Sequence, residues 1–231
     1  MSFVTEEVTP AVEEYLECIY RLEEKCGVAK TKDIVKMMGV TPGTVTNTVE
    51  WLEKSGLVTH QPYRGVKLTS RGRMIAIQVL RKHRLAERLL VDILRVEWEK
   101  AHDLACRLEH SLTEEIIKSL EKALKNPKTC PHGNPIPTEC GALIEEEAVP
   151  LTDLDIGSEG TIARIVEENE DLLRYLSGLG AFPGVFVRVL GKNPLDGSLT
   201  IMVGENLNVL SSKIASVIRI RRLVEDGAFY G

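Results

Sequence analysis

The chain has 231 residues, of which 43% are hydrophobic and 27% are charged, and its formal net charge is −5. This composition fits a globular protein with one large or two modest domains, and the net acidity excludes a uniformly basic nucleic-acid binder. No apolar run approaches the roughly 20 residues that cross a bilayer, and the acidic start MSFVTEEVTPAVEEY is unlike a secretory signal. The five cysteines lack the spacing of a disulfide framework, so we expect a reducing cytoplasm.

The charges are segregated along the chain. Residues 25–75 hold nine Lys and Arg against three Asp and Glu, whereas residues 141–180 hold two Arg against ten Asp and Glu. A basic N-terminal third on an acidic chain favours local contact with a polyanion and predicts binding that weakens with salt.

The first third of the chain has the order of a helix-turn-helix. Apolar periodicity predicts a helix over 12–24, and Thr31 is placed to cap a second, short helix over 32–38. Thr41 as N-cap, followed by a proline at the first helical position, predicts a third helix over 42–55. The exposed face of this third helix carries hydroxyl and amide groups, which suit base edges and phosphates in a major groove.

Two short strands, 57–60 and 65–68, surround a basic turn and complete a winged helix-turn-helix. The alternative is a small helical domain whose basic face is only solvated, or a winged helix that contacts protein. If the domain binds DNA, the residues expected to face the groove are Thr41, Pro42, Thr44, Thr46 and Asn47. The residues expected to contact phosphates are Thr31, Lys32, Tyr63, Arg64 and Lys67.

Two predicted helices, 71–93 and 96–109, carry side chains of the types that bind metals. These side chains are His83, Glu87, His102, Cys106, Glu109 and His110. On a helix the last four project within about 100° of one another, a stripe that is normally apolar. A thiolate with carboxylates and imidazoles suits a late first-row divalent metal. The alternative is a polar solvated face with an incidental cysteine. The large apolar residues that remain exceed the core of a helical pair, so they predict a homodimer.

The stretch 126–137 has four prolines and a glycine, which predict a loop without regular structure. Cys130, His132 and Cys140 could be zinc ligands, but a structural zinc site needs four ligands and usually paired spacing. We therefore favour an ordered loop packed on the helical domain, followed by an acidic linker over 141–150.

The remaining residues, 151–231, predict a small SH3-like β-barrel that has a regulatory or interaction role. They contain no nucleophile–base pair and no loop that would cradle phosphate. Asp196-Gly197 is a strong hairpin signal. The strands are expected at 160–166, 185–190, 199–203 and 216–221, with a helix at 169–177.

The order of these features resembles the diphtheria toxin repressor family of iron- and manganese-dependent transcriptional regulators. The resemblance rests on the winged helix, RKHRLAERLL, the H-x3-C-x2-E-H pattern in AHDLACRLEH, GNPIP and the tail, and it covers essentially the whole chain. It implies a mainly α protein with a small β domain. The implied parts are a DNA-binding domain (1–72), a helical metal-binding and dimerisation domain (73–140), a linker (141–150) and an SH3-like, FeoA-like domain (151–231).

The resemblance also implies a homodimer that binds operator DNA when loaded with Fe²⁺ and controls metal-uptake genes; Mn²⁺ is the alternative metal. His83, Glu87 and His102 resemble the family's ancillary site, to which Glu167, Glu168 or Glu170 could add a ligand. Cys106, Glu109 and His110 resemble three ligands of the primary site. The fourth is Glu14, where the family's iron sensors carry Met; a carboxylate replaces Cys106 in the manganese sensors. The thiolate favours Fe²⁺.

Two other functions remain open at this point. A metalloenzyme needs an open coordination position and a general base, and no spare base is evident near the predicted ligands, so we expect no enzyme. A metal-independent winged-helix repressor with structural clusters would bind DNA equally well with and without metal.

Overall fold

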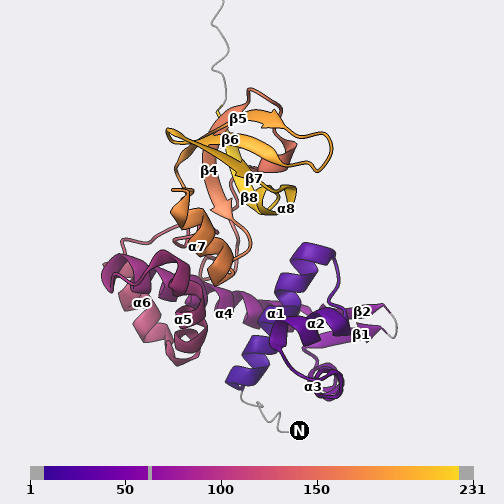
Figure 1. The fold of residues 1–231 in the computed structure, drawn as a ribbon. Coiled ribbons are helices and arrows are strands. Elements are labelled where there is room, and N and C mark those ends of the chain that lie inside the picture. Colours follow the sequence, from indigo (N-terminus) through magenta and orange to yellow (C-terminus); the bar gives the residue numbers. More distant parts are fainter. Residues whose placement is uncertain (1–7, 62–63, 224–231) are drawn as a thin grey trace, which may run out of the picture. The chain divides into compact units, whose positions relative to one another are not determined.

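The computed structural model describes residues 8–61 and 64–223, and the chain divides into two compact units. The first unit contains Met1–Lys82 and Pro137–Ala142, and the second contains His83–Ile136 and Leu143–Gly231. The elements of both units are labelled in Figure 1. None of the helices in the described ranges is long and apolar enough to cross a membrane.

The first unit is the predicted winged helix-turn-helix. Val12, Leu16 and Ile19 on the first helix are buried, and so are Val45 and Leu52 on the third. The two short strands pair in antiparallel register. The elements are α1 (Pro10–Cys26), α2 (Thr31–Met38), α3 (Pro42–Lys54), β1 (Val58–Gln61), β2 (Gly65–Leu68) and the first part of α4 (Ser70–Arg88).

The helix ends of this unit follow from local chemistry. The Thr9 and Thr41 side chains accept hydrogen bonds from the backbone at the starts of α1 and α3, and Gly27 ends α1 at a φ of 76°. The predicted cap at Thr31 is wrong, because Thr31 is the first residue of α2 and Lys30 occupies the cap position without a side-chain bond. The backbone bridge between Ala29 and Val66 keeps the chain extended up to that point.

The second unit begins with the end of α4, and here the two predicted long helices are interrupted. α4 gives way to a π-helical turn over Leu89–Ile93, and Arg95 takes a left-handed φ of 59°. The next helix, α5, spans only Ala101–Leu108, after a 3-10 turn over Trp98–Lys100. A further 3-10 turn covers Glu109–Ser111. The stripe of ligand types predicted at α-helical spacing is therefore broken at its last two members.

Helix α6 (Glu114–Ala123) begins at the predicted cap, Thr113, whose side chain accepts from the Ile116 backbone. The following loop has the predicted lack of regular structure, apart from one bridge between Thr129 and Pro135. It is buried nonetheless, since residues 130–136 are all inaccessible to solvent or nearly so.

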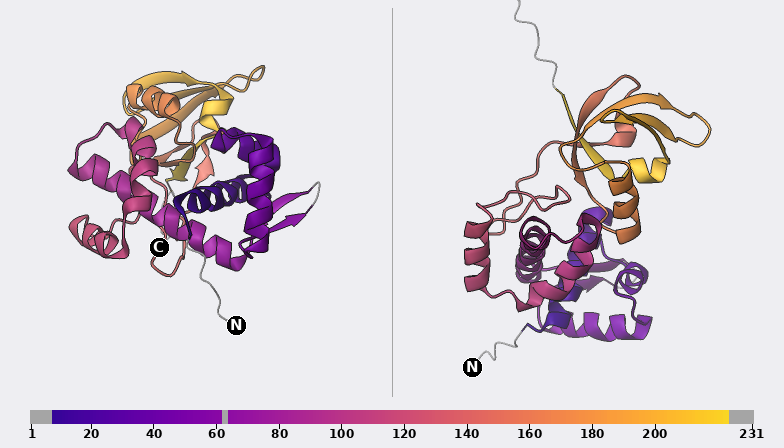
Figure 2. Two further views of the ribbon diagram at one scale, coloured as in Figure 1. Left: turned by 90° about the horizontal axis from the view of Figure 1, so that it is seen from below. Right: turned by 60° about the vertical axis from the view of Figure 1, so that its left-hand side comes forward.

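The rest of the unit is a six-stranded antiparallel sheet of order β3-β8-β4-β5-β6-β7, strongly curved in both views of Figure 2. Among the described residues no pairing of β3 with β7 closes it into a barrel, although the SH3-like class is compatible with this arrangement. The elements are β3 (Val149–Pro150), β4 (Glu159–Ile165), α7 (Glu170–Gly178), β5 (Phe186–Lys192), β6 (Leu199–Val203), β7 (Asn206–Leu210), α8 (Ser212–Ala215) and β8 (Ile218–Arg222).

The predicted strands all occur, with the Asp196-Gly197 turn between β5 and β6. Sequence reasoning missed β3, β7 and α8. β7 reads Asn-Leu-Asn-Val-Leu and exposes most of its side chains, so its strand character comes from pairing with β6 rather than from burial.

Candidate metal centre

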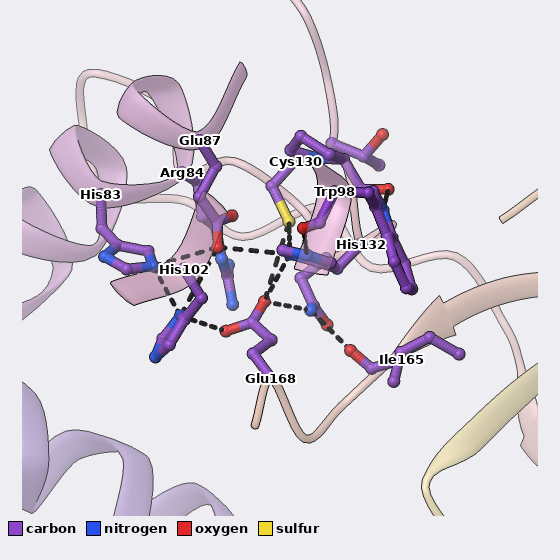
Figure 3. Close-up of polar contacts among 12 residues, drawn as sticks. His83, Arg84, Glu87, Trp98, His102, Cys130, His132, Ile165 and Glu168 are labelled. Carbon is purple, nitrogen blue, oxygen red and sulfur yellow. Dashed lines mark hydrogen bonds and ion pairs between the residues drawn. The ribbon is translucent and has the colours of Figure 1, made fainter. Parts of the chain in front are cut away.

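Side chains of metal-ligand type converge in the second unit from four separate segments. These side chains form three overlapping clusters, and within each cluster all the ligand atoms lie within 4.8 Å of one another. Ligand-type side chains come from α4, α5, the loop after α6 and the segment between β4 and α7 (Figure 3). The clusters are His83–His102–Cys106, His83–Glu87–His102–Glu168 and Glu87–Cys130–His132–Glu168.

His83 and Glu87 are the two buried residues that α4 contributes to this centre. They lie one turn apart on α4, and both side chains are fully buried. The Nε2 atom of His83 lies 3.2 Å from Oε1 of Glu87 and 3.0 Å from Nδ1 of His102. The predicted set of His83, Glu87 and His102 is therefore brought together by the fold.

The second predicted set, Cys106, Glu109 and His110, is arranged differently. The sulfur of Cys106 lies 3.9 Å from ring nitrogens of both His83 and His102. Glu109 is buried, and its Oε2 lies 2.6 Å from Nδ1 of His83 while its Oε1 lies 3.4 Å from Nε2 of His110. Glu109 and His110 follow the end of α5. Cys106 therefore shares a cluster with His83 and His102, and not with Glu109 and His110.

The loop after α6 delivers Cys130 and His132 to the centre, and Gly133 makes this possible. A Cβ on Gly133 would lie 2.1 Å from the carbonyl oxygen of Ala163 on β4, and its φ of +86° favours glycine. The loop is also held from α4, where Nε of Arg88 donates to the Thr129 carbonyl at 2.6 Å.

Glu168 follows β4 and enters the centre from the sheet. Its Oε2 lies 3.3 Å from Nδ1 of His102. Asn134 positions it by donating from Nδ2 both to Oε1 of Glu168 and to the carbonyl of Ile165, each at 2.8 Å. Of the three C-terminal carboxylates predicted as possible ligands, Glu168 reaches the clusters, whereas Glu170 pairs with Arg174 on α7.

Electrostatics in the centre favour protonated histidines facing ionised carboxylates. Burial lowers the pKa of His83, but the Glu87 charge and hydrogen bonds to Cys106 and Glu109 outweigh it, so the pKa is raised well above its ordinary value. Burial and the neighbouring charge of Glu168 raise the pKa of Glu87, but the surrounding histidines outweigh them and hold it well below normal.

The same balance acts on the other ligand types. Burial opposes protonation of His102, yet bonds to Cys106 and two carboxylates raise its pKa to about 11. Burial raises the pKa of the Cys106 thiol, but the histidines beside it bring it below the usual value. Burial and Glu87 raise the pKa of Cys130 to about 11. A divalent cation could replace the protons that now balance these charges.

A buried carboxylate oxygen of Glu87 further indicates that the residues of this centre fit a metal ion. In the part of the chain that the structure describes, Oε2 of Glu87 is buried without a hydrogen-bond partner. A buried carboxylate oxygen is costly unless a donor or cation meets it. The donor set of imidazoles, carboxylates and thiols matches a late first-row divalent ion.

Glu14 is exposed on α1 and belongs to the first unit, so its part in a metal site stays a prediction from sequence. Cys140 is also exposed and takes no part in the three clusters. Cys130 and His132, for which we favoured a plain loop, are by contrast cluster members. Their signal was the i, i+2 spacing in Cys-Pro-His-Gly-Asn, which lacks the pairing of a zinc site.

The predicted DNA-contacting residues lie on the surface of the first unit. The five expected to face the groove are all exposed, and so are Lys32, Arg64 and Lys67, while Thr31 is half-buried. Tyr63 lies outside the described residues. The hydroxyls of Thr41 and Thr44 are 2.9 Å apart, so part of their capacity is used within the helix start.

Comparison with known proteins agrees with this architecture. Residues 7–66 match the N-terminal DNA binding domain of iron dependent repressors, and residues 69–138 match their metal binding and dimerisation domain. Residues 149–222 match the FeoA domain.

Full-length relatives and solved structures point the same way. The chain is 36% identical over 230 residues to the iron-dependent repressor IdeR of Mycobacterium bovis, covering 94% of this chain and 99% of the relative. It is 41% identical over 171 residues to the diphtheria toxin repressor of Corynebacterium glutamicum, covering 72% of this chain and 75% of that one. A manganese-dependent transcriptional repressor in complex with manganese superposes with a TM-score of 0.83 at 30% identity, covering 91% of this chain and 99% of that one.

A DNA-binding domain joined to a metal-binding and dimerisation domain defines a class of metal-dependent transcriptional repressors, which are not enzymes. The chain is such a repressor. It belongs to the iron-dependent repressor family, whose members include the diphtheria toxin repressor.

Proposed function

We propose that the chain acts in the cytoplasm as a homodimer that binds operator DNA when loaded with Fe²⁺, and so represses genes of metal uptake. The observation that carries this proposal is the buried ligand centre in a chain with a DNA-binding domain. Within the described ranges, one carboxylate oxygen of Glu87 in this centre has no hydrogen-bond partner. Thiols at Cys106 and Cys130 support Fe²⁺, because thiolates prefer later metals than Mn²⁺. Mn²⁺ is the second candidate, since repressors named for it share the fold.

The functional parts that we propose are a DNA-binding domain over 1–72, a helical metal-binding and dimerisation domain over 73–140, a linker over 141–150 and an SH3-like domain over 151–231. The ligands that we propose are those of the clusters, together with Glu109, His110 and, from sequence alone, Glu14.

The proposed mechanism is linkage between metal and DNA binding. The bound ion supplies positive charge that joins carboxylates and imidazoles from distant segments. His83 and Glu87 are the residues that hold it from α4, the helix whose earlier turns belong to the DNA-binding unit. If the ion binds the DNA-competent state more tightly by about 1–3 kcal/mol, operator affinity rises about 5- to 150-fold.

An anaerobic DNA-binding titration tests this proposal. A fluorescent duplex, selected from random sequences in the presence of Fe²⁺, is titrated with protein in chelator, in Fe²⁺ and in Mn²⁺. We expect about 5- to 150-fold tighter binding with metal, no such gain for Glu87→Gln, and a normal gain for the surface control Glu170→Gln. Equal affinity in chelator and in metal would contradict the proposal. Activation at lower free Mn²⁺ than free Fe²⁺ would make the chain a manganese sensor.

The DNA contacts have a separate test on the same duplex. Lys67→Ala should weaken binding on every sequence and reduce the slope of log affinity against log salt by about 1, because one phosphate contact is lost. Asn47→Ala should instead relax sequence preference. Unchanged salt dependence and unchanged preference would remove these two residues from the interface.

A further inference from the structure

Helix α3 presents a stripe of exposed residues on the side opposite its buried side chains. The buried residues of this helix are Val45, Val49 and Leu52. At about 100° per residue, the exposed stripe spans about 60° and its centre lies about 160° from the centre of the buried set. The residues of the stripe are Gly43, Asn47, Glu50 and Lys54. The recognition helix of a helix-turn-helix lies in the major groove, so this stripe is the part of α3 that meets base edges when the domain binds DNA.

The threonine hydroxyls of α3 are engaged within the helix itself. Oγ1 of Thr41 accepts from the backbone N–H of Thr44 at 3.2 Å, and the hydroxyls of these two residues lie 2.9 Å apart. The Thr46 hydroxyl donates at 3.0 Å to the carbonyl four residues before it. By contrast, within the described ranges neither the Asn47 amide nor the Glu50 carboxylate takes part in a hydrogen bond or an ion pair. These two side chains therefore keep their full hydrogen-bonding capacity for a partner outside the protein.

Gly43 opens a space at the start of the stripe that the fold itself does not require. Its φ is not positive, and a Cβ there would meet only the Thr41 hydroxyl oxygen at 3.9 Å, which is an ordinary contact. Glycine in a helix is destabilising relative to alanine, so the folded chain by itself would favour a side chain at this position. The missing Cβ instead allows a second surface to approach the backbone closely, next to Asn47 and Glu50.

The chemistry of the base edges gives Glu50 a definite preference in the major groove. An ionised carboxylate accepts hydrogen bonds and donates none. Cytosine presents the N4 amino donor, whereas guanine and thymine present acceptors, and adenine places an acceptor beside its amino donor. The carboxylate is therefore attracted to cytosine and repelled by guanine and thymine. Phosphates repel it as well, so Glu50 weakens binding to DNA in general and favours sites that supply a donor.

We propose that Glu50 is a specificity-determining residue of the DNA-binding domain, which accepts a hydrogen bond from the N4 amino group of a cytosine in each half-site. Asn47 precedes Glu50 by about 4.5 Å along the helix axis, and base pairs are stacked about 3.4 Å apart. Asn47 therefore contacts a base pair beside this cytosine. Lys54, one turn beyond Glu50, contacts a phosphate of the backbone. This inference rests on the proposed binding of operator DNA and adds a base that the operator must contain.

The test compares the sequences that wild type and variants select from random duplexes, anaerobically and with Fe²⁺ bound to the full-length chain. Wild type should select one cytosine in each half-site, and replacing it should weaken binding about 5- to 150-fold. Glu50→Ala should lose this difference and bind the replaced duplexes more tightly than wild type does, because a charge that repels phosphates is gone. Glu50→Gln should select adenine at that position, since a glutamine amide bonds both N6 and N7 of adenine.

Glu53→Gln is the matched control, because it makes the same change of charge on the same helix outside the stripe. Oε1 of Glu53 accepts from the backbone N–H of His60 at 2.9 Å, and a glutamine oxygen can keep that bond. This variant should keep the preference for cytosine. Alanine and glutamine are good helix formers, and thermal unfolding checks that each variant is folded.

The inference is overturned if Glu50→Ala selects the same bases as wild type at every position, which would make Glu50 a solvated surface carboxylate. A wild type that selects no cytosine also overturns it and leaves the repressor proposal standing. Equal affinity of wild type in chelator and in Fe²⁺ would refute the metal-dependent function, while the base preferences would still support or overturn the role of Glu50. A wild type that selects no duplex at all refutes both.

Discussion

Gly133→Ala is the substitution for which the structure gives the sharpest expectation. The added Cβ would lie 2.1 Å from the Ala163 carbonyl oxygen and 2.8 Å from the Arg164 Cα, both of them backbone atoms that cannot rotate away. A left-handed φ costs a residue with a side chain about 1–2 kcal/mol, and forcing a packed backbone apart costs about 1–3 kcal/mol. We therefore expect a loss of about 2–5 kcal/mol in the free energy of unfolding of the second unit.

The measurement uses Trp98, whose ring lies 4.8 Å from that of His132 and whose Nε1 donates to the Pro131 carbonyl. In a Trp51→Phe background its fluorescence reports the loop during thermal unfolding. A loss of this size lowers the midpoint by about 5–15 °C. Because the loop carries Cys130 and His132, Mn²⁺ affinity should fall as well.

Gly178→Ala is the matched control. Gly178 lies at the end of α7 without a positive φ, and a Cβ there meets nothing within 4 Å. This change should be neutral or stabilise by up to about 1 kcal/mol. If Gly133→Ala melts and binds Mn²⁺ as Gly178→Ala does, the loop does not depend on the close approach to β4 and our reasoning about the centre is wrong.

Three further outcomes follow from the contacts described above. Asn134→Ala removes the amide that positions Glu168, and we expect about 10- to 100-fold weaker Mn²⁺ binding by calorimetry; an unchanged dissociation constant would count against that role. Because the pKa of His102 is raised to about 11, a metal ion must displace the proton of this histidine when it binds. Mn²⁺ affinity should therefore rise between pH 6 and 8 by about tenfold per pH unit for each proton displaced. An Mn²⁺ affinity that does not change with pH would contradict the protonated cluster. Burial raises the pKa of the Cys18 thiol to about 12, whereas a threonine hydroxyl lowers the pKa of the exposed Cys140 thiol. Brief labelling of the metal-free chain with a thiol-reactive reagent, read by mass spectrometry, should therefore modify Cys140 and leave Cys18 unmodified. Modification of Cys18 before Cys140 would refute this order of reactivity.

Features encoded over a few residues could be predicted from the sequence. Thr41 and Thr113 cap helices as expected because a capping hydroxyl contacts a backbone group only three residues away. Strands β4 and β6 were readable because their side chains alternate between core and surface. β7 was not, since its exposed leucines and asparagines become a strand only through the partner strand.

Within the metal centre the division is similar. His83 and Glu87 were found as a pair because they stand one turn apart on one helix. Glu109 was expected on the same stripe as Cys106, but the end of α5 turns it toward His83 instead. Helix ends depend on tertiary packing, so a spacing that crosses one is a weaker guide than a spacing inside a helix.

The amino-acid sequence by itself determined the order of the domains, the residue types available as ligands and the family to which the chain belongs. Tertiary structure alone decided that Cys130 and Glu168, 38 positions apart, meet Glu87 in one buried centre. The physical reason is that the spacing of residues along the sequence does not determine the distance between separate segments in the folded chain. That distance is set by Gly133, which lets a loop touch a strand, and by Asn134, which holds a carboxylate from the sheet against the helices.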